Sequence, residues 1–291
     1  MNYRERPPSS ALTPFVDRLW FLEGRPDALI PEPVLPDGHV EIIVHAGDPF
    51  ALVAADGSLQ TQATTLVAGQ LTRAIALAPR GFARVVGARL RAHGLHALFG
   101  LPQRVVTDRV VDLVDVDRRL ARVIRQDVIG RTDADDLFSA FDRALCRVLP
   151  AATVPSAAAR AAERARESLG LVRVEDLAQH AGVSRRQLER QFQDEIGLAP
   201  KKYLRVLRFQ QVLGALSVAS HPPRWAELAL ARGFYDQAHF INDFRSFTGQ
   251  TPSAWRVDES SLTAVFSAIG RNRVDDEEAV AFLQDRPAVG S

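Results

Sequence analysis

A short run in the C-terminal half of the chain is rich in side chains that can bind the edges of DNA bases. Leu188 and Phe192 are spaced one helical turn apart and are expected to pack inward. The side chains that then point outward are Arg185, Arg186, Glu189 and Arg190. Arginine can donate two parallel hydrogen bonds to guanine, and glutamate can accept one from cytosine. The alternative is that each of these side chains is an ordinary polar residue of the protein surface and does not contact DNA.

The run belongs to a sequence pattern that occurs twice. The first copy reads VEDLAQHAGVSRRQLERQFQDEIGLAP, and the second reads WAELALARGFYDQAHFINDFRSFTGQTP. Leu177, Ala178 and Gly182 of the first copy recur 51 positions later, and five further positions of that copy recur 52 positions later. A repeat of this length indicates one supersecondary unit that is used twice.

Each copy is predicted to form a helix, a tight turn and a second helix. Gly182 and Gly233 are expected to end the first helix, because glycine adopts a positive φ most easily. Ser184 and Asp236 are residue types that cap the N-terminus of the second helix. The arrangement is a helix-turn-helix, in which the second helix can enter the major groove of DNA.

In these residues the chain resembles the AraC/XylS family of bacterial transcription regulators, over residues 157–256. The most specific part is the second copy, which contains GF at 233–234, DQ at 236–237, HF at 239–240 and GQTP at 249–252. The resemblance implies two helix-turn-helix units that face the same side of DNA. It also implies that a long helix joins them, and the sequence places this helix at 201–217.

The resemblance also implies which side chains touch DNA. It places base contacts on Arg186, Glu189, Arg190, Gln237, Ala238, His239 and Asn242. Glutamine and asparagine suit adenine, while His239 has a structural role as its alternative. Phosphate contacts position a protein on DNA without specifying the sequence. We assign such contacts to Arg185, Arg205, Arg208 and Arg245.

The N-terminal half has a β pattern. A PDG turn at 36–38 precedes an alternating strand at 39–45, and further strands are predicted at 51–53, 64–68, 74–78 and 83–90. Residues 15–22 are expected to form a first strand or a short helix. Residues 1–14 are expected to be loosely held. The LPDG turn resembles the degenerate cupin-like sensor domains that precede the DNA-binding domain in some AraC-type regulators. Helices are predicted at 92–99, 116–128 and 134–149, and the last two could pack on the β domain or on a second subunit.

One strand face of this half could bind a ligand. Alternation along the strand places His39, Glu41 and His45 on the same side. We predict that His39 and Glu41 contact a small organic molecule, with packing or surface roles as the alternative. Zinc and iron sites usually need three or four convergent ligands, and the usual cupin metal motif is missing. We therefore predict no metal and no cofactor.

Composition and charge set the broad class of the protein. Its 291 residues suit about two domains, and neither an apolar membrane span nor an apolar signal core is present. The lone Cys146 excludes an intrachain disulfide and suits a reducing cytoplasm. Residues 157–256 carry 15 basic and 10 acidic side chains, whereas residues 257–291 carry 3 and 7. The positive charge is therefore concentrated on the duplicated unit, as phosphate binding requires.

We predict an α+β chain with an N-terminal β-rich, cupin-like domain that carries helices and a C-terminal all-α domain with two helix-turn-helix units. The predicted limits are 1–150 for the sensor or regulatory domain, 151–156 for a linker, 157–256 for the DNA-binding domain and 257–291 for an acidic tail.

The favoured function is a cytoplasmic, sequence-specific transcription regulator without catalysis. Its partner is double-stranded promoter DNA, with RNA polymerase, a small-molecule effector and a second copy of the chain as further candidates, and no membrane. Two alternatives stay open at this point. One is a cupin-like metalloenzyme with a DNA-binding appendage, and the other is an architectural DNA binder.

Overall fold

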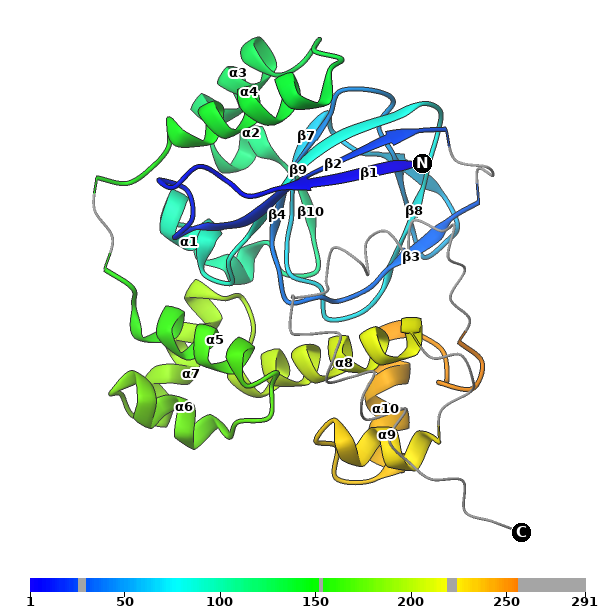
Figure 1. Cartoon of the computed structure of the whole chain (residues 1–291), viewed down its shortest axis with the longest axis vertical. Coiled ribbons are helices and arrows are strands. Elements are labelled where there is room, and N and C mark those ends of the chain that lie inside the picture. Colours follow the sequence, from blue (N-terminus) through cyan, green and yellow to red (C-terminus); the bar gives the residue numbers. More distant parts are fainter. Residues whose placement is uncertain (26–29, 152–153, 219–223, 256–291) are drawn as a thin grey trace.

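The computed structural model describes residues 1–25, 30–151, 154–218 and 224–255. A β-rich part with its own helices lies above an all-helical part in Figure 1. The predicted α+β class, with a β-rich region followed by a helical region, is confirmed.

The β-rich part contains two antiparallel sheets. The larger sheet has the strand order β1-β2-β9-β4-β7-β10, and the smaller one has the order β3-β8-β5-β6. The strands of the larger sheet are β1 (Asn2–Arg6), β2 (Val16–Gly24), β9 (Ala83–Leu90), β4 (Glu41–His45), β7 (Thr65–Ala68) and β10 (Val110–Asp112). The strands of the smaller sheet are β3 (Glu32–Val34), β8 (Ile75–Ala78), β5 (Ala51–Val53) and β6 (Leu59–Thr61).

Apolar side chains cover both faces of the larger sheet, because each face has a different partner. On one face Trp20 and Val85 pack with Phe50 and Leu77 in a small cluster shared with the other sheet. On the other face a larger cluster joins the sheet to the helices of this part, of which α2, α3 and α4 lie together at the top of Figure 1. These helices are α1 (Gly94–Phe99), the 3-10 turn η1 (Gln103–Val105), α2 (Leu113–Val116), α3 (Arg118–Asp127) and α4 (Ala134–Cys146).

The helical part is built around one long helix. Figure 1 shows α8 (Pro200–Val218) crossing it, with α5, α6 and α7 at one end and α9 and α10 at the other. The bounds of the others are α5 (Ala157–Glu167), α6 (Val174–Ala181), α7 (Arg185–Glu195), α9 (Trp225–Ala231) and α10 (Gln237–Thr248). Aromatic rings fix the packing on α8. The ring centroids of Phe192 and Tyr203 are 5.8 Å apart, and those of Phe209 and Phe244 are 5.6 Å apart.

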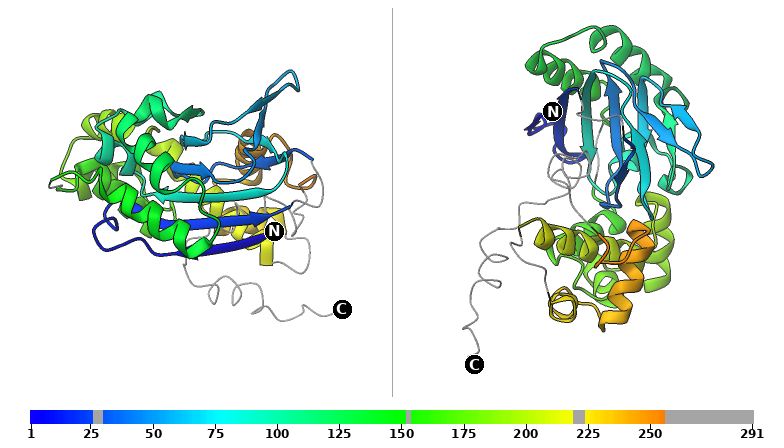
Figure 2. Two further views of the ribbon diagram at one scale, coloured as in Figure 1. Left: turned by 90° about the horizontal axis from the view of Figure 1, so that it is seen from above. Right: turned by 90° about the vertical axis from the view of Figure 1, so that its right-hand side faces the viewer.

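Two local expectations are wrong. Residues 2–6 are not loosely held but form β1, which pairs with β2 from Asn2 opposite Glu23 to Arg6 opposite Leu19. The Thr-Pro pair at 251–252 predicts a final short helix with Trp255 in the core; residues 252–254 form a turn instead, and Trp255 is buried against Phe244 as expected. The sequence also predicts a helix at 276–283, which lies outside the described residues. Figure 2 shows the β-rich and helical parts in two further orientations.

Candidate nucleic-acid interface and sensor cavity

The first helix-turn-helix unit consists of α6 and α7. Gly182 ends α6 with a φ of 70°, in the left-handed region that favours glycine. The hydroxyl of Ser184 then caps α7 by accepting a hydrogen bond from the backbone N–H of Gln187 at 3.3 Å. Leu188 and Phe192 are fully buried, so the opposite side of α7 faces solvent.

The second unit, α9 and α10, repeats this geometry. Gly233 follows α9 with a φ of 73°, and the carboxylate of Asp236 caps α10 by accepting from the backbone N–H of His239 at 2.7 Å. Phe240 and Phe244 are fully buried in the positions that Leu188 and Phe192 hold in the first unit. The two units therefore present equivalent helix faces, although the turn of the second is one residue longer.

Most of the predicted DNA contacts lie at the N-terminal ends of the two recognition helices. Exposed side chains there are Arg185, Arg186, Arg190, Gln237, Ala238 and Asn242, and Glu189 and His239 are half-buried. The C-terminal ends of both helices instead contact the β-rich part, as described below. The N-terminal ends are thus directed away from the β sheets, and the β-rich part does not cover them.

Three of the four predicted phosphate contacts, Arg185, Arg205 and Arg208, have partners inside the helical part. Arg205 forms two hydrogen bonds, of 2.8 and 2.5 Å, with the carboxylate of Asp243, which is 3% exposed. Arg208 donates to the carbonyl of Gly170 at 2.9 Å, and burial lowers its pKa. Both side chains hold segments of the helical part together, whereas Arg185 pairs at the surface with Glu175 and Glu189. The phosphate role stays a prediction for all four arginines.

Two further side chains at the interface differ from the sequence-based expectation. His239 lies with its Nε2 3.7 Å from an oxygen of Asp243 and its ring edge-on to Phe234, so its contacts are partly structural. Tyr235 was not predicted as a contact, yet it is 87% exposed directly before the cap of α10. An aromatic residue in this turn is the signal that could have identified it, because a phenol can donate to a phosphate oxygen.

The β-rich part contacts the first unit through the loop around η1. Arg104 forms an ion pair with Asp194 near the end of α7, and the hydroxyl of Thr107 donates to the carbonyl of Gly197 at 2.8 Å. A Cβ atom at Gly197 would approach this hydroxyl to 2.8 Å, and the residue has a φ of 84°. Only glycine therefore fits the contact without strain.

A second loop contacts the other unit. The backbone N–H of Ala74 donates to the carbonyl of Phe247, near the end of α10, at 2.8 Å. Asp108 connects this loop to the one around η1, because its carboxylate accepts from the N–H and the hydroxyl of Thr72 at 2.6 and 2.7 Å. Asp108 also has a φ of 57°, which is uncommon outside glycine. One connected pair of loops thus touches both helix-turn-helix units.

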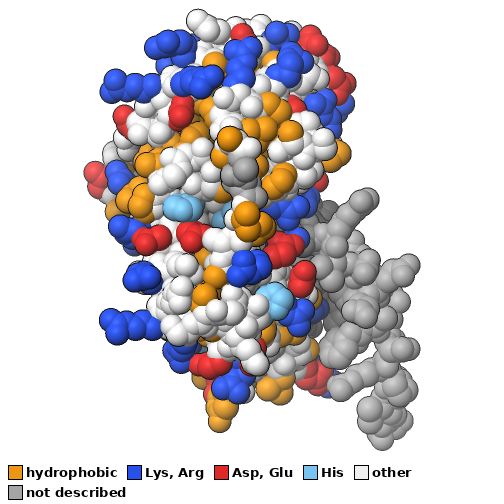
Figure 3. All heavy atoms as spheres, turned by 90° about the vertical axis from the view of Figure 1, so that its left-hand side faces the viewer, with side chains coloured by type: hydrophobic (Ala, Val, Ile, Leu, Met, Phe, Trp, Pro, Cys, Tyr) orange, Lys and Arg blue, Asp and Glu red, His pale blue; other side chains and the backbone are white. Residues whose placement is uncertain are grey.

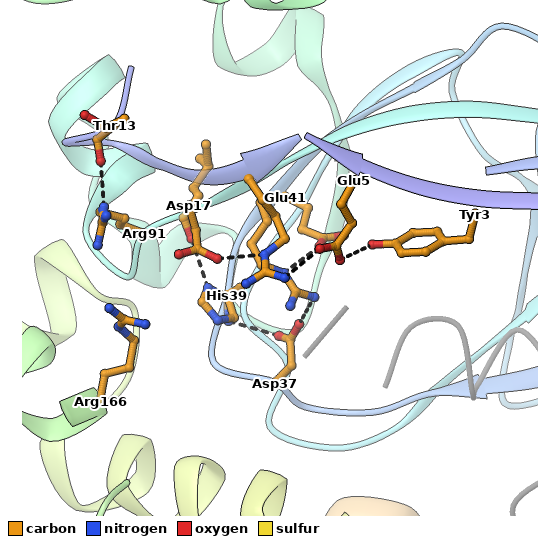
Figure 4. Close-up of polar contacts among 12 residues, drawn as sticks. Tyr3, Glu5, Thr13, Asp17, Asp37, His39, Glu41, Arg91 and Arg166 are labelled. Atoms are coloured by element: carbon orange, nitrogen blue, oxygen red, sulfur yellow. Dashed lines mark hydrogen bonds and ion pairs between the residues drawn. The ribbon is translucent and has the colours of Figure 1, made fainter. Parts of the chain in front are cut away.

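Charged side chains gather where the two parts meet beside α5. Figure 4 shows Asp17, His39 and Arg91 of the β-rich part facing Arg166 of the helical part. Glu163 of α5 lies 3.6 Å from Arg91 and 2.6 Å from Arg166. His39 donates from Nδ1 to the carbonyl of Leu90 at 3.0 Å, and burial lowers its pKa.

A cavity of about 60 Å³ lies between the two sheets. Its walls are mainly apolar. They include Glu41, Ile43 and His45 of β4 and also His39, which lies two residues before this strand. The structure therefore brings the predicted ligand residues His39 and Glu41 to one cavity and adds His45. Within the described residues no group of three or more histidine, cysteine or acidic side chains is placed to hold a metal ion.

Comparisons with known proteins match the β-rich part and the helical part of the chain separately. Residues 4–112 match a domain of unknown function, DUF6597, and residues 177–258 match a helix-turn-helix domain. The HTH-type transcriptional regulator MtrA of Neisseria gonorrhoeae is 31% identical over 85 residues, which are 29% of this chain and 28% of that protein. The HTH-type transcriptional regulator ArgR of Pseudomonas aeruginosa is 36% identical over 78 residues, or 27% of this chain and 23% of that protein. The chain thus spans less than a third of the length of either relative.

Two solved structures also align with most of the chain, at TM-scores below 0.5. ToxT from Vibrio cholerae matches with a TM-score of 0.42 and 11% identity, covering 87% of this chain and 97% of that one. The AraC-like transcriptional activator CuxR matches with a TM-score of 0.26 and 13% identity, covering 72% and 86%. Among the helices in the described residues, none is long and apolar enough to cross a membrane.

Proposed function

We propose that the C-terminal part of this chain is a DNA-binding domain of the AraC type, and that the protein is a sequence-specific transcription regulator that binds promoter DNA. The observation that carries the proposal is the matched pair of recognition helices. The N-terminal ends of α7 and α10 are exposed and carry arginine, glutamine and asparagine side chains. These are the groups that distinguish base pairs in the major groove.

A single chain supplies both recognition helices. Their buried faces are fixed on the same helix, α8, by Tyr203 and Phe209. We expect each recognition helix to enter its own segment of the major groove, with the two segments about one helical turn of DNA apart. Because the two helices differ in sequence, the site bound by one chain is asymmetric and needs no palindrome.

The β-rich part is proposed to sense a small molecule in the cavity between its sheets. The cavity walls lie next to the contacts with the DNA-binding part. Leu35 and Asp37 line the cavity, and the carbonyl of Pro36 between them accepts from the side chain of Gln210 on α8 at 2.6 Å. Leu71 and Ile75 also line the cavity. They belong to the same segment of the chain as Thr72, which binds Asp108, and Ala74, which contacts the second unit. A ligand that shifts these walls would act on DNA affinity through differential binding to two arrangements.

We also propose that the protein assembles with a second copy of the chain or with RNA polymerase. The charge of one surface limits how two copies can contact each other. The exposed side of α3 carries arginines that form no ion pair within the described part of the chain, namely Arg118, Arg119, Arg122 and Arg125. Figure 3 shows basic side chains gathered at this end of the molecule. A symmetric contact through α3 would place like charges together, so we expect a homodimer to use another surface.

Binding-site selection from random duplex DNA with the full chain tests the proposal. The expected result is an enriched asymmetric motif, bound with an affinity that falls steeply as salt rises, because bound phosphates release counterions. Competition with unrelated DNA excludes an architectural binder if the motif is strongly preferred. Binding without any sequence preference would contradict the proposal. Stoichiometric iron or zinc in the purified protein would favour the metalloenzyme alternative.

A further inference from the structure

One end of the cavity carries more negative than positive charge. The guanidinium of Arg89 is buried between two carboxylates, with Nη2 2.7 Å from Asp37 and Nε 3.1 Å from Glu41. Its side chain is 3% exposed, and the carboxylates are 21% and 13% exposed. One guanidinium thus faces two carboxyl groups. Burial raises the pKa of Glu41, so a second cation at this end would stabilise the charged form of its carboxylate.

A hydrogen-bond acceptor without a partner lies at the other end. His45 is 2% exposed, and its Nε2 lies 3.1 Å from the side-chain oxygen of Gln62. An amide oxygen can only accept, so Nε2 carries the proton and Nδ1 has a free lone pair. This Nδ1 has no hydrogen-bond partner among the described residues. A buried polar atom without a partner is costly, and a ligand that donates to it would remove that cost.

The space between the two ends is apolar and narrow. Trp20, Ile43, Leu77 and Val85 are among its walls. Glu41 and His45 are four residues apart on β4, which corresponds to roughly 13 Å along the strand. A cavity of about 60 Å³ drawn out over such a distance fits a slender chain better than a broad ring system.

We propose that this cavity binds a slender organic cation, an aliphatic amine whose ammonium group contacts Glu41 beside the guanidinium of Arg89 and whose far end donates a hydrogen bond to Nδ1 of His45. The apolar stem lies along Ile43 and the walls around it. A buried cation needs a paired charge, and the surplus carboxylate supplies it. The same charge disfavours an organic anion. The inference rests on the proposed function, since it names the ligand class of the proposed sensor domain.

Calorimetric titration and thermal unfolding of the full chain test the inference with four probes of similar size. Aminohexanol carries both the cation and the donor, hexylamine the cation alone, hexanediol the donors alone, and hexanoate the opposite charge. We expect aminohexanol to bind most tightly and to raise the melting temperature by mass action. Hexanoate should produce no shift. Binding of hexanoate as tight as that of aminohexanol would overturn the inference.

Substitutions at the two ends of the cavity test the ammonium contact and the hydrogen bond to His45 separately. Glu41→Gln keeps the shape of the side chain and removes its charge, so aminohexanol should bind at least about tenfold more weakly. Asp37→Asn provides the same test should Glu41→Gln fail to fold. His45→Phe should weaken aminohexanol and leave hexylamine unchanged. The control Asp115→Asn, an exposed carboxylate on α2, should change neither. Unchanged aminohexanol binding in both carboxylate variants would contradict the assignment.

DNA binding by the same preparations is measured without any amine. If the protein selects a DNA motif but binds no amine, the inference fails and the proposed function stands. If it binds an amine but no DNA, the proposed function fails and the ligand class stands. An amine that binds and changes the affinity for the selected motif supports both.

Discussion

Arg205 on α8 and Asp243 on α10 form a two-point ion pair, with N–O distances of 2.8 and 2.5 Å, inside the second helix-turn-helix unit. The carboxylate side chain is 4% exposed and the arginine side chain 26%. Together with the contact of Phe209 and Phe244, this pair fixes the recognition helix α10 on the long helix that also carries the first unit. The spacing of the two recognition helices therefore depends on a charge pair and not on apolar packing alone.

Breaking this pair is expected to destabilise the protein. Arg205→Ala leaves the buried carboxylate of Asp243 without its charged partner, and we expect a loss of about 3 kcal/mol in the free energy of unfolding. Urea denaturation measures it. As a control, Arg185→Ala removes exposed ion pairs with Glu175 and Glu189 and should cost far less, because water screens them. Equal losses in the free energy of unfolding for the two substitutions would show that the buried pair stabilises the fold no more than an exposed pair.

The two recognition helices are expected to specify separate base pairs. Arg186→Ala should weaken binding to the selected motif by about 1–3 kcal/mol and relax preference in one segment, and Gln237→Ala should do the same in the other. Arg245→Ala, a predicted phosphate contact, should weaken all sequences alike and reduce the salt dependence. Binding-site selection with the three variants measures this. Loss of preference at the same base pairs in both base-contact variants would show that the two-groove assignment is wrong.

Contact between the β-rich part and the first unit is expected to require glycine at position 197. Gly197→Ala would place a methyl group against Thr107 and strain a residue whose φ is 84°. We expect a loss of at least about 1 kcal/mol in stability, because both effects oppose the native conformation. Thermal unfolding measures it. Gly57→Ala is the control, since that position has a similar φ of 80° with open space around it, so the difference between the two isolates the contact.

Stability is expected to fall as the pH drops below the ordinary pKa of histidine. Burial lowers the pKa of His45 to about 4. Below pH 6.5 this side chain is therefore protonated in the unfolded chain while it stays neutral in the folded chain. Stability then decreases progressively between about pH 6.5 and pH 4, by up to about 3 kcal/mol. Burial also lowers the pKa of His39 and His93, which contribute in the same direction.

Substitution isolates the contribution of His45. His45→Phe keeps a ring against Phe50, whose centroid lies 5.4 Å from that of His45, and removes the titrating group. Denaturation at a series of pH values should give a shallower dependence in the variant. An identical dependence in both proteins would mean that His45 is not the group that titrates.

Local signals in the sequence were enough to predict the doubled helix-turn-helix. The caps at Ser184 and Asp236 and the positive-φ glycines Gly182 and Gly233 act over a few residues, and they specify where a helix begins or ends whatever surrounds it. Alternation along β4 likewise predicted the shared face of His39, Glu41 and His45, because successive side chains of a strand point to opposite sides.

Long-range contacts decided the rest. The polar N-terminal residues carry no strand pattern, and β1 forms because its backbone pairs with β2. Arg205 and Arg208 are residue types that often contact phosphates. In the structure Arg205 instead binds the carboxylate of Asp243, and Arg208 donates to the carbonyl of Gly170, each 38 positions away in the sequence. Arg89 likewise lies beside two carboxylates about 50 positions away. The sequence determined which groups each element presents, and only the tertiary structure decided which of them meet, because that depends on distances between elements that no local pattern encodes.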